Sequence, residues 1–293
     1  TFEKNNEDPI KSLKKLITQS KIDIPEHLPP LSAGLFGYIG YDMVSYFENI
    51  KIKNNDPLNL PETILMRPSL ICIFDRLKDE FILITPVRAK KDISALDAWE
   101  NGKNILSNAV NELNVGLEHR NLPVQKDTML DNDAPSNLEK LDFYNSVEKA
   151  KEYIKSGDIY QVVLSQRFEI PFKKSSISFY RSLRRLNPSP FLFHFNFKDF
   201  FVVGSSPEIL VRLRNNECTI RPIAGTRPRG SNKSEDLSLK EELLNDPKER
   251  AEHLMLLDLG RNDVGRVSKP GSVEVTESFS VEMYSHVMHI ESE

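Results

Sequence analysis

The chain has 293 residues, of which 28% are charged and 39% are hydrophobic, and its formal net charge at pH 7 is −4. This is the composition of an ordinary globular protein, and it excludes collagen-like, disulfide-scaffold and mostly disordered chains. Because acidic residues slightly outnumber basic ones, we expect neither nucleic acid nor an anionic membrane as a partner. The length predicts about two domains.

The two cysteines and the apolar runs indicate the compartment. Cys72 and Cys218 lie outside any CxxC or Cys/His pattern, which favours a reducing, cytoplasmic location. The longest apolar runs are far shorter than the roughly 20 residues that a membrane-spanning helix needs, so we expect no membrane partner. The first residues show neither an initiator Met nor a signal-peptide pattern, and we expect that the chain begins midway in a longer sequence.

The first part of the chain predicts two helices around a hairpin. Apolar residues recur at helical spacing from Pro9 to Ser20 and again from Ser94 to Leu113. Between these segments, apolar runs around Ile71 and Ile82 flank a charged stretch, as in a β-hairpin.

A linker is predicted over residues 115–137, which are rich in Asn, Asp and Pro and poor in periodic apolar residues. It would separate an N-terminal region, 1–114, from a second domain, 138–293.

The second part predicts clustered strands between helices. We expect a helix that Gly157 terminates, another from Ser176 to Leu186, and a long one after Asp246. The predicted strands are Tyr160–Phe168, Phe191–Phe197, Phe200–Gly204, Ile209–Leu213, Cys218–Ile223 and Val281–Glu293. Strands grouped in this way favour an α+β fold of mostly antiparallel sheets packed with helices.

Two carboxylates stand out on the long helix. Asp246, Pro247 and Glu249 form a capping-box pattern, so a structural role for Glu249 is about as well supported as a chemical one. Glu252 lies one turn further on the same face, where both carboxylates could address a hard cation such as Mg²⁺. Such pairs are also common on solvated helices.

The segment from Ile223 to Gly230 has the composition of a small-anion site. Gly225 permits close approach to the backbone, while Thr226, Arg227 and Arg229 supply a hydroxyl and positive charge that suit a carboxylate. The alternative is a strand that leaves its sheet into a loop with solvated arginines.

Three further residues could transfer protons. Glu208 follows a predicted strand, where partial burial could raise its pKa and make it an acid; the alternative is an ordinary edge-strand Glu. His286 and His289 are three apart in the last predicted strand and would point to opposite faces, so we expect at most one to serve a site.

These segments together resemble the chorismate-utilising enzyme family, and most closely its anthranilate synthase component I members. The resemblance implies a two-subdomain sandwich and a Mg²⁺-dependent lyase that converts chorismate and ammonia to anthranilate and pyruvate in tryptophan biosynthesis. Ammonia would come from a glutamine amidotransferase subunit, component II. The matching segments are GLFGYIGYD (34–42), SGDIYQVVLSQR (156–167), NPSP (187–190), SPE (206–208), RPIAGTRPRG (221–230), LDLGRND (257–263) and HVMHI (286–290).

The resemblance also implies roles for residues. Glu208 matches the acid that protonates the departing C4 hydroxyl of chorismate, and His289 matches a histidine that helps to remove the C2 proton. Gly225 and Thr226 match substrate contacts. Glu252 matches a Mg²⁺ ligand, with Glu249 as an outer partner through water.

Two positions distinguish this chain from related branches. Isochorismate and salicylate synthases carry a water-activating Lys where Gln161 stands, and an uncharged amide cannot act as that base. Many aminodeoxychorismate synthases carry a nucleophilic Lys where Ala224 stands. Both positions favour ammonia as the nucleophile and anthranilate as the product.

Feedback by tryptophan is also implied. Asn187, Pro190, Phe191 and Leu192 match one wall of the family's allosteric tryptophan site, although a proline-rich turn between a helix and a strand would look similar. The other half of that pocket, an N-terminal Glu-Ser segment, has no match in this chain.

The family continues well beyond the position that matches Glu293, through a second Mg²⁺ ligand and a carboxylate-binding Arg. We therefore expect 293 residues from the middle of a longer enzyme, inactive and poorly stable alone. Two rival interpretations remain: aminodeoxychorismate synthase component I of the folate pathway, and a non-catalytic homologue that binds chorismate or tryptophan.

Overall fold

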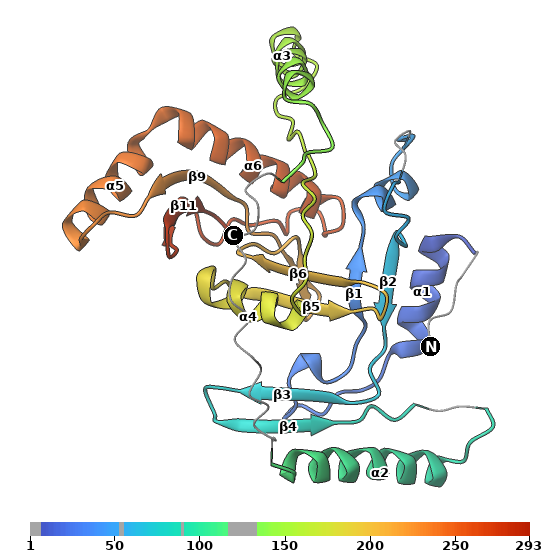
Figure 1. The fold of residues 1–293 in the computed structure, drawn as a ribbon. Helices are drawn as coiled ribbons and strands as arrows, with labels where there is room; N and C mark the ends of the chain where they lie inside the picture. The colour runs from blue at the N-terminus through green and yellow to red at the C-terminus, as the bar shows by residue number, and fades with distance from the viewer. Residues whose placement is uncertain (1–6, 53–55, 89–90, 117–133) are drawn as a thin grey trace. The chain divides into compact units, whose positions relative to one another are not determined.

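The computed structural model describes residues 7–52, 56–88, 91–116 and 134–293, shown in Figure 1. Two compact units divide the chain, Thr1–Asp127 and Thr128–Glu293. The dividing point falls inside the predicted linker, 115–137, most of which lies outside the described residues, so the predicted domain limits stay a prediction.

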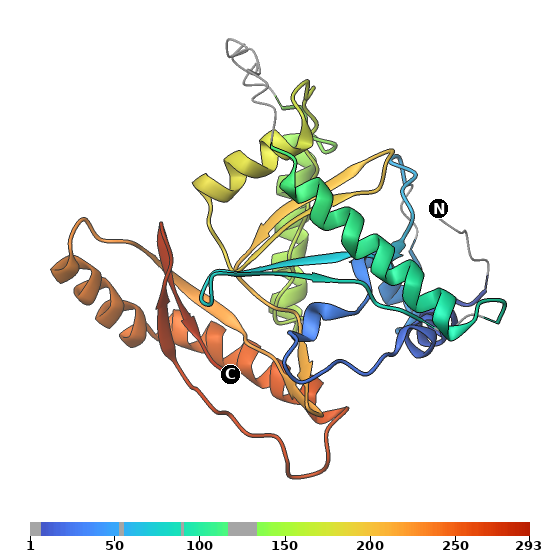
Figure 2. The same ribbon diagram turned by 90° about the horizontal axis from the view of Figure 1, so that it is seen from below.

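The first unit contains two capped helices and two hairpin-like strand pairs. The side chain of Asp8 accepts a hydrogen bond from the backbone N–H of Lys11 and begins α1, and Ser94 begins α2 in the same way through Asp97. Helix α2 packs along β4, as Figure 2 shows. The elements are α1 (Pro9–Ser20), β1 (Phe36–Ile39), β2 (Thr63–Met66), β3 (Ile71–Asp75), β4 (Glu80–Ile84), α2 (Ala95–Asn114) and short 3₁₀ helices at Pro30–Ser32 and Tyr41–Tyr46.

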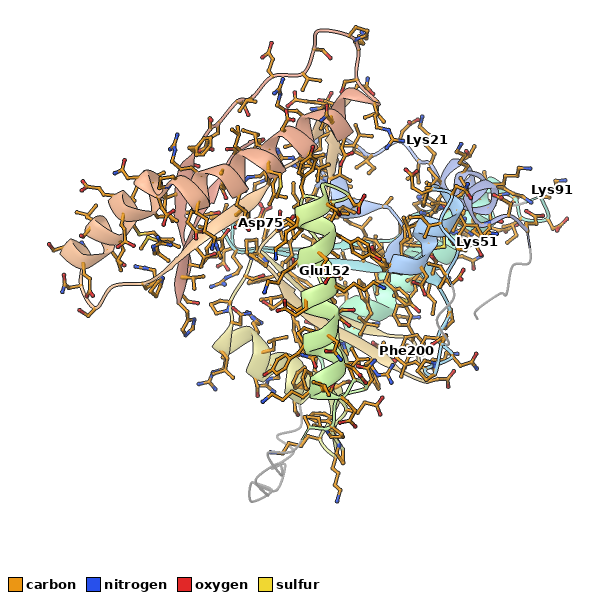
Figure 3. The ribbon with its side chains drawn as sticks, turned by 90° about the horizontal axis from the view of Figure 1, so that it is seen from above. Lys21, Lys51, Asp75, Lys91, Glu152 and Phe200 are labelled. Carbon is orange, nitrogen blue, oxygen red and sulfur yellow. The ribbon has the colours of Figure 1, made fainter. Side chains whose placement is uncertain are left out.

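The second unit begins with helices around a long hairpin. Helix α3 ends at Gly157, which adopts the left-handed conformation (φ +79°) that the sequence predicts for it. Figure 3 labels Glu152 on α3 and Phe200 in the turn between β5 and β6. These elements are α3 (Lys140–Ser156), α4 (Ser176–Leu186), β5 (Phe191–Asn196), β6 (Phe201–Ser206), β7 (Arg212–Arg214) and β8 (Glu217–Thr219).

The rest of the second unit is a three-stranded sheet that packs on two helices. The sheet has the order β10-β11-β9, with both neighbouring pairs antiparallel, and its strands pack against α5 and α6. The elements are β9 (Ile223–Pro228), α5 (Lys233–Asn245), α6 (Pro247–Gly265), β10 (Ser280–Met283) and β11 (Val287–Glu291).

The core of this unit lies between β11 and α5. Met288 and Ile290 are fully buried on one face of β11 and pack with the fully buried Leu243 of α5. Because side chains alternate along a strand, His289 points to the opposite face of the sheet. The buried face therefore fixes which side of the sheet carries the polar residues.

The α+β fold class is confirmed, but two predicted strands and one predicted loop are wrong. Residues 160–168 form no strand, because among the described residues their only pairing is a single bridge between Ser136 and Phe168. Residues 281–293 do not form one strand: they belong to the hairpin of β10 and β11. The segment from Ile223 to Pro228, predicted to follow a strand, is itself the strand β9.

In the part of the chain that the structure describes, no helix has the length and hydrophobicity needed to cross a membrane.

Candidate active site

A β-bulge in β9 shapes the site. Thr226 pairs with His289 and Ala224 with Ile290, so Gly225 is an extra residue with no partner in the ladder. Its φ is +79°, and a Cβ there would lie 3.1 Å from Cδ1 of Ile290. The backbone conformation favours glycine, and a Cβ would also require Ile290 to shift slightly; the bulge redirects the next residue, Thr226.

Thr226 and His289 contact each other across the two strands. Nδ1 of His289 lies 3.0 Å from Oγ1 of Thr226 and 3.3 Å from the carbonyl oxygen of Gly225. A carbonyl oxygen can only accept, so the Gly225 contact is a hydrogen bond when Nδ1 carries the proton. Nε2 is then the basic nitrogen of neutral His289.

Glu208 lies near the same two strands. Partial burial raises the pKa of its carboxyl above the ordinary value, while a backbone hydrogen bond with Ile223 and the charge of His289 act in the opposite direction. A raised pKa keeps a larger fraction of Glu208 protonated near neutral pH. Glu208, Gly225, Thr226 and His289 thus lie close to one another, and their catalytic and binding roles stay predictions.

His286 lies outside this group. It precedes β11, is exposed, and its Nδ1 lies 2.8 Å from Oγ of Ser285. The structure therefore places one of the two candidate histidines at the site, though His286 stands before the strand rather than on its opposite face.

Glu249 connects α6 to the bulge and does not complete a capping box. Asp246 caps α6 through the backbone N–H groups of Lys248 and Glu249, but its own N–H bonds to the carbonyl of Leu243. The carboxylate of Glu249 instead accepts the backbone N–H of Thr226 at 3.1 Å. The structural interpretation of Glu249 as a cap partner is wrong, because the nearby strand supplies a better-placed donor.

Glu252 is half-buried one turn further along α6, and its carboxylate has no hydrogen-bond or ion-pair partner among the described residues. In that same part of the chain, no group of three or more His, Cys, Asp and Glu side chains could hold a metal ion. The donor set of Glu252 and Glu249 offers carboxylate oxygens on one helix face, which suits a hard cation that keeps several waters.

The arginines after the bulge are engaged in ion pairs with acidic residues. Arg227 binds Glu242 at 2.8 Å and Asp246 at 2.6 Å, and its NH1 lies 3.6 Å from Glu249. Arg229 forms a two-bond pair with Asp236 at 3.0 and 2.6 Å. Both arginines are occupied by acidic side chains, so neither sequence-based interpretation, an anion-binding site or a loop with solvated arginines, is confirmed. Their ion pairs instead join the end of β9 to α5 and α6.

The remaining predicted site residues lie elsewhere in the second unit. Gln161 is exposed and lines a cavity of about 590 Å³ with Met255, Leu259 and other residues of α6. The four residues predicted for tryptophan binding run from the C-cap of α4 to the start of β5, where Phe191 pairs with Ser206, two residues before Glu208. These four are Asn187, Pro190, Phe191 and Leu192.

Sequence reasoning missed a polar network beside His289. Tyr284 stacks edge-on against the His289 ring and donates to Glu282, and Arg221 forms an ion pair with the nearly buried Glu291. Burial raises the pKa of Glu291 to about 7, assisted by the facing Glu282 and opposed by Arg221. The sequence YSHVMHI places Tyr284 five residues before His289. Glu282 comes to lie opposite His289 only through the pairing of β10 with β11.

Comparison with known proteins identifies the family. The family model of chorismate binding enzymes matches residues 1–293. Among curated proteins, anthranilate synthase component 1 of Cereibacter sphaeroides is 50% identical over 287 residues, which cover 97% of this chain and 56% of that protein. The Aquifex aeolicus protein of the same name is 44% identical, covering 98% and 57%. The chain thus spans little more than half the length of these relatives.

Comparison with solved structures points to the same family. Anthranilate synthase component I from Streptococcus pneumoniae superimposes with a TM-score of 0.82 at 33% identity, covering 98% of this chain and 62% of that one. A menaquinone-specific isochorismate synthase from Escherichia coli, at 14% identity and a TM-score of 0.54, shares the fold. The match over the whole chain and the grouping of Glu208, Thr226 and His289 lead to one conclusion: this chain belongs to the chorismate binding enzyme family.

Proposed function

We propose that the chain carries the substrate-binding part of an anthranilate synthase aminase subunit, which converts chorismate and ammonia to anthranilate and pyruvate in tryptophan biosynthesis. The observation that carries this proposal is the convergence of Glu208, Thr226 and His289 around the bulge at Gly225. The identity of 40–50% to proteins named anthranilate synthase component 1 supports it.

Glu208 serves as the general acid. Ammonia adds at C2 of chorismate as the C4 hydroxyl leaves, and hydroxide is a poor leaving group unless it is protonated. Because burial raises the pKa of Glu208, a larger fraction of its carboxyl holds a proton to donate than in an exposed Glu.

His289 serves as the base for the second step, in which the C2 proton is removed and pyruvate is expelled. Its Nδ1 donates toward Gly225 and Thr226, so Nε2 is free to accept that proton. When Nδ1–H donates to Oγ1, the Thr226 hydroxyl keeps its own hydrogen available for an oxygen of the substrate.

Glu252 would hold Mg²⁺, with Glu249 binding it through water. When bound, the ion would neutralise the ring carboxylate of chorismate. A Glu252→Gln variant of the 293-residue chain should bind Mg²⁺ more weakly than the wild type in calorimetry with chorismate present. A Glu274→Gln variant, at an exposed position outside α6, is the matched control.

Further properties follow from the same proposal. A glutamine amidotransferase subunit supplies ammonia, and tryptophan binds at Asn187, Pro190, Phe191 and Leu192 as a feedback inhibitor.

The uncharged Gln161 provides no base to activate water, which favours ammonia as nucleophile. Cys72 and Cys218 are both free, which supports a reducing cytoplasm.

Product analysis tests the proposal. In a chimaera, this chain replaces the 287 matching residues of the Cereibacter sphaeroides relative. Given chorismate, Mg²⁺ and ammonium, it should form anthranilate and pyruvate in equal amounts, measured by fluorescence and by a coupled lactate dehydrogenase assay. The unmodified relative is the positive control, and the 293-residue chain alone should give no product.

Two outcomes would contradict the proposal. An aminated chorismate that keeps its enolpyruvyl group, with no pyruvate, would indicate aminodeoxychorismate synthase. Chorismate binding without any product would indicate a non-catalytic homologue.

A further inference from the structure

The hairpin of β10 and β11 places two polar residues around His289. Glu282 of β10 pairs directly with His289 of β11, and the backbone N–H of Tyr284 donates to the carbonyl of Val287 where the hairpin turns. Directly opposed residues of an antiparallel pair have neighbouring side chains on the same face. The face that carries His289 is therefore the face that carries Glu282.

Tyr284 contacts both of these residues. Its ring lies 5.5 Å from the imidazole of His289, centroid to centroid, with the two planes at 64°. Its hydroxyl donates to Oε2 of Glu282 at 2.7 Å. The aromatic ring is thus fixed at one end by a charge-assisted hydrogen bond and rests against the histidine with its body.

The protonation states of the two residues keep this bond in place. Burial and the carboxylate of Glu282 raise the pKa of Tyr284 far above its ordinary value, so the phenol stays neutral and remains a donor. Hydrogen bonds with Glu291 and Tyr284 lower the pKa of Glu282, so this carboxylate remains an acceptor. Tyr284 is therefore a donor and Glu282 an acceptor near neutral pH.

His289 is therefore held from two sides. On the β9 side, the carbonyl of Gly225 and the hydroxyl of Thr226 contact Nδ1, and on the β10 side, Tyr284 contacts the ring. We propose that Tyr284, anchored by Glu282, is a positioning residue that keeps the imidazole of His289 with Nδ1 toward Gly225 and Nε2 toward the substrate. The proposal deepens the proposed function, on which the role of His289 as a base rests.

The proposal has a consequence that can be observed without substrate. If the ring is held in this orientation, we expect neutral His289 to carry its proton on Nδ1, because only that tautomer hydrogen-bonds the carbonyl of Gly225, and the Thr226 hydroxyl can accept from the same N–H. If the ring is released, the Nε2–H tautomer, which predominates in a freely solvated imidazole, should become populated. The share of the Nδ1–H tautomer therefore reports the orientation that Tyr284 imposes.

Nitrogen-15 NMR of the histidine side chains in the chimaera measures that share at an alkaline pH, at which imidazole groups are neutral. We expect the Nδ1–H form to predominate in the wild type, to decrease in Tyr284→Phe, which keeps the ring but loses the anchor, and to decrease further in Tyr284→Leu. Tyr153→Leu on α3 is the matched control and should leave the share unchanged.

The proposal is overturned if Tyr284→Leu has the same share of the Nδ1–H tautomer as the wild type. The far-ultraviolet circular dichroism spectrum of the variant must be unchanged, which shows that it is folded. If Tyr284→Leu does not fold, Tyr284→Phe decides in the same way, because the loss of one hydroxyl leaves the packing volume unchanged.

Turnover in the chimaera gives a second readout. Tyr284→Leu should lower kcat on the order of tenfold while KM stays within about twofold, since orientation of the base matters in the transition state more than in binding. A chimaera that forms no anthranilate in the wild type would count against the proposed function. The tautomer measurement would still decide the positioning role by itself.

Discussion

Gly225 shows how one residue determines the geometry of the site. Its left-handed backbone produces the bulge, the bulge turns Thr226 toward His289, and the backbone N–H of Thr226 then bonds to Glu249 on α6. A glycine at this position is visible in the sequence, from which we predicted that a ligand would approach the backbone closely. The close neighbour turns out to be Ile290, from a strand 65 residues further along the chain.

A Gly225→Ala substitution should lower the free energy of unfolding by about 1–3 kcal/mol, because alanine must adopt a left-handed φ and also displace Ile290. Urea unfolding of the 293-residue chain measures this cost. Gly157→Ala is a matched control, since Gly157 has the same φ of +79° but nothing within 4 Å of the added Cβ. If both variants lose the same stability, the contact with Ile290 costs nothing, and that part of the account is wrong.

At the scale of elements, sequence patterns were most reliable where local chemistry defines both ends. Helix α1 begins at Pro9 after the Asp8 cap and ends at Ser20, and α4 begins after Ser175 and ends at Leu186, as predicted. The helix boundaries at caps therefore follow from nearby residues alone.

Elements that depend on distant partners were predicted less well. Residues 160–168 have strand-like composition, but a strand also needs a neighbour, which composition does not reveal. The hairpin turn before Val287 was missed because apolar alternation continues on both sides of it. For the same reason, the partnership of Tyr284 and Glu282 with His289 could not be predicted, since it depends on the register of β10 on β11.

Asp246 links two elements, because it caps α6 and binds Arg227 of β9. We expect Asp246→Ala to lower the free energy of unfolding by about 1–2 kcal/mol, measured by urea unfolding. Asn232→Ala is the control, since Asn232 caps α5 through the N–H groups of Ser234 and Glu235 but has no arginine partner among the residues that the structure describes. A smaller loss for Asp246→Ala than for Asn232→Ala would contradict the link to β9.

At the scale of the whole molecule, buried charge makes stability depend on pH. The pKa of Glu291 rises from an ordinary 4.5 to about 7 in the folded protein. Between these two values the folded state binds more protons than the unfolded state. The contribution of Glu291 to stability is therefore fully present below about pH 4.5 and is lost as the pH rises through about 7.

A comparison of the wild type with Glu291→Gln over pH 5 to 8 isolates this effect from other carboxylates. The wild type should lose stability relative to the variant as the pH rises, because glutamine does not titrate. Thermal unfolding midpoints of both proteins measure the difference. A difference between the two midpoints that stays constant over this range would show that Glu291 titrates normally.

Our central proposal is that Glu208, on the loop after β6, forms one catalytic site with Thr226 of β9 and His289 of β11. The most direct test is the initial rate of anthranilate formation by the chimaera with Glu208→Gln, because glutamine keeps the shape of the side chain but cannot donate a proton to the leaving hydroxyl. The account predicts a loss of about 10²–10⁴-fold in kcat, whereas a rate equal to that of the unsubstituted chimaera would contradict it.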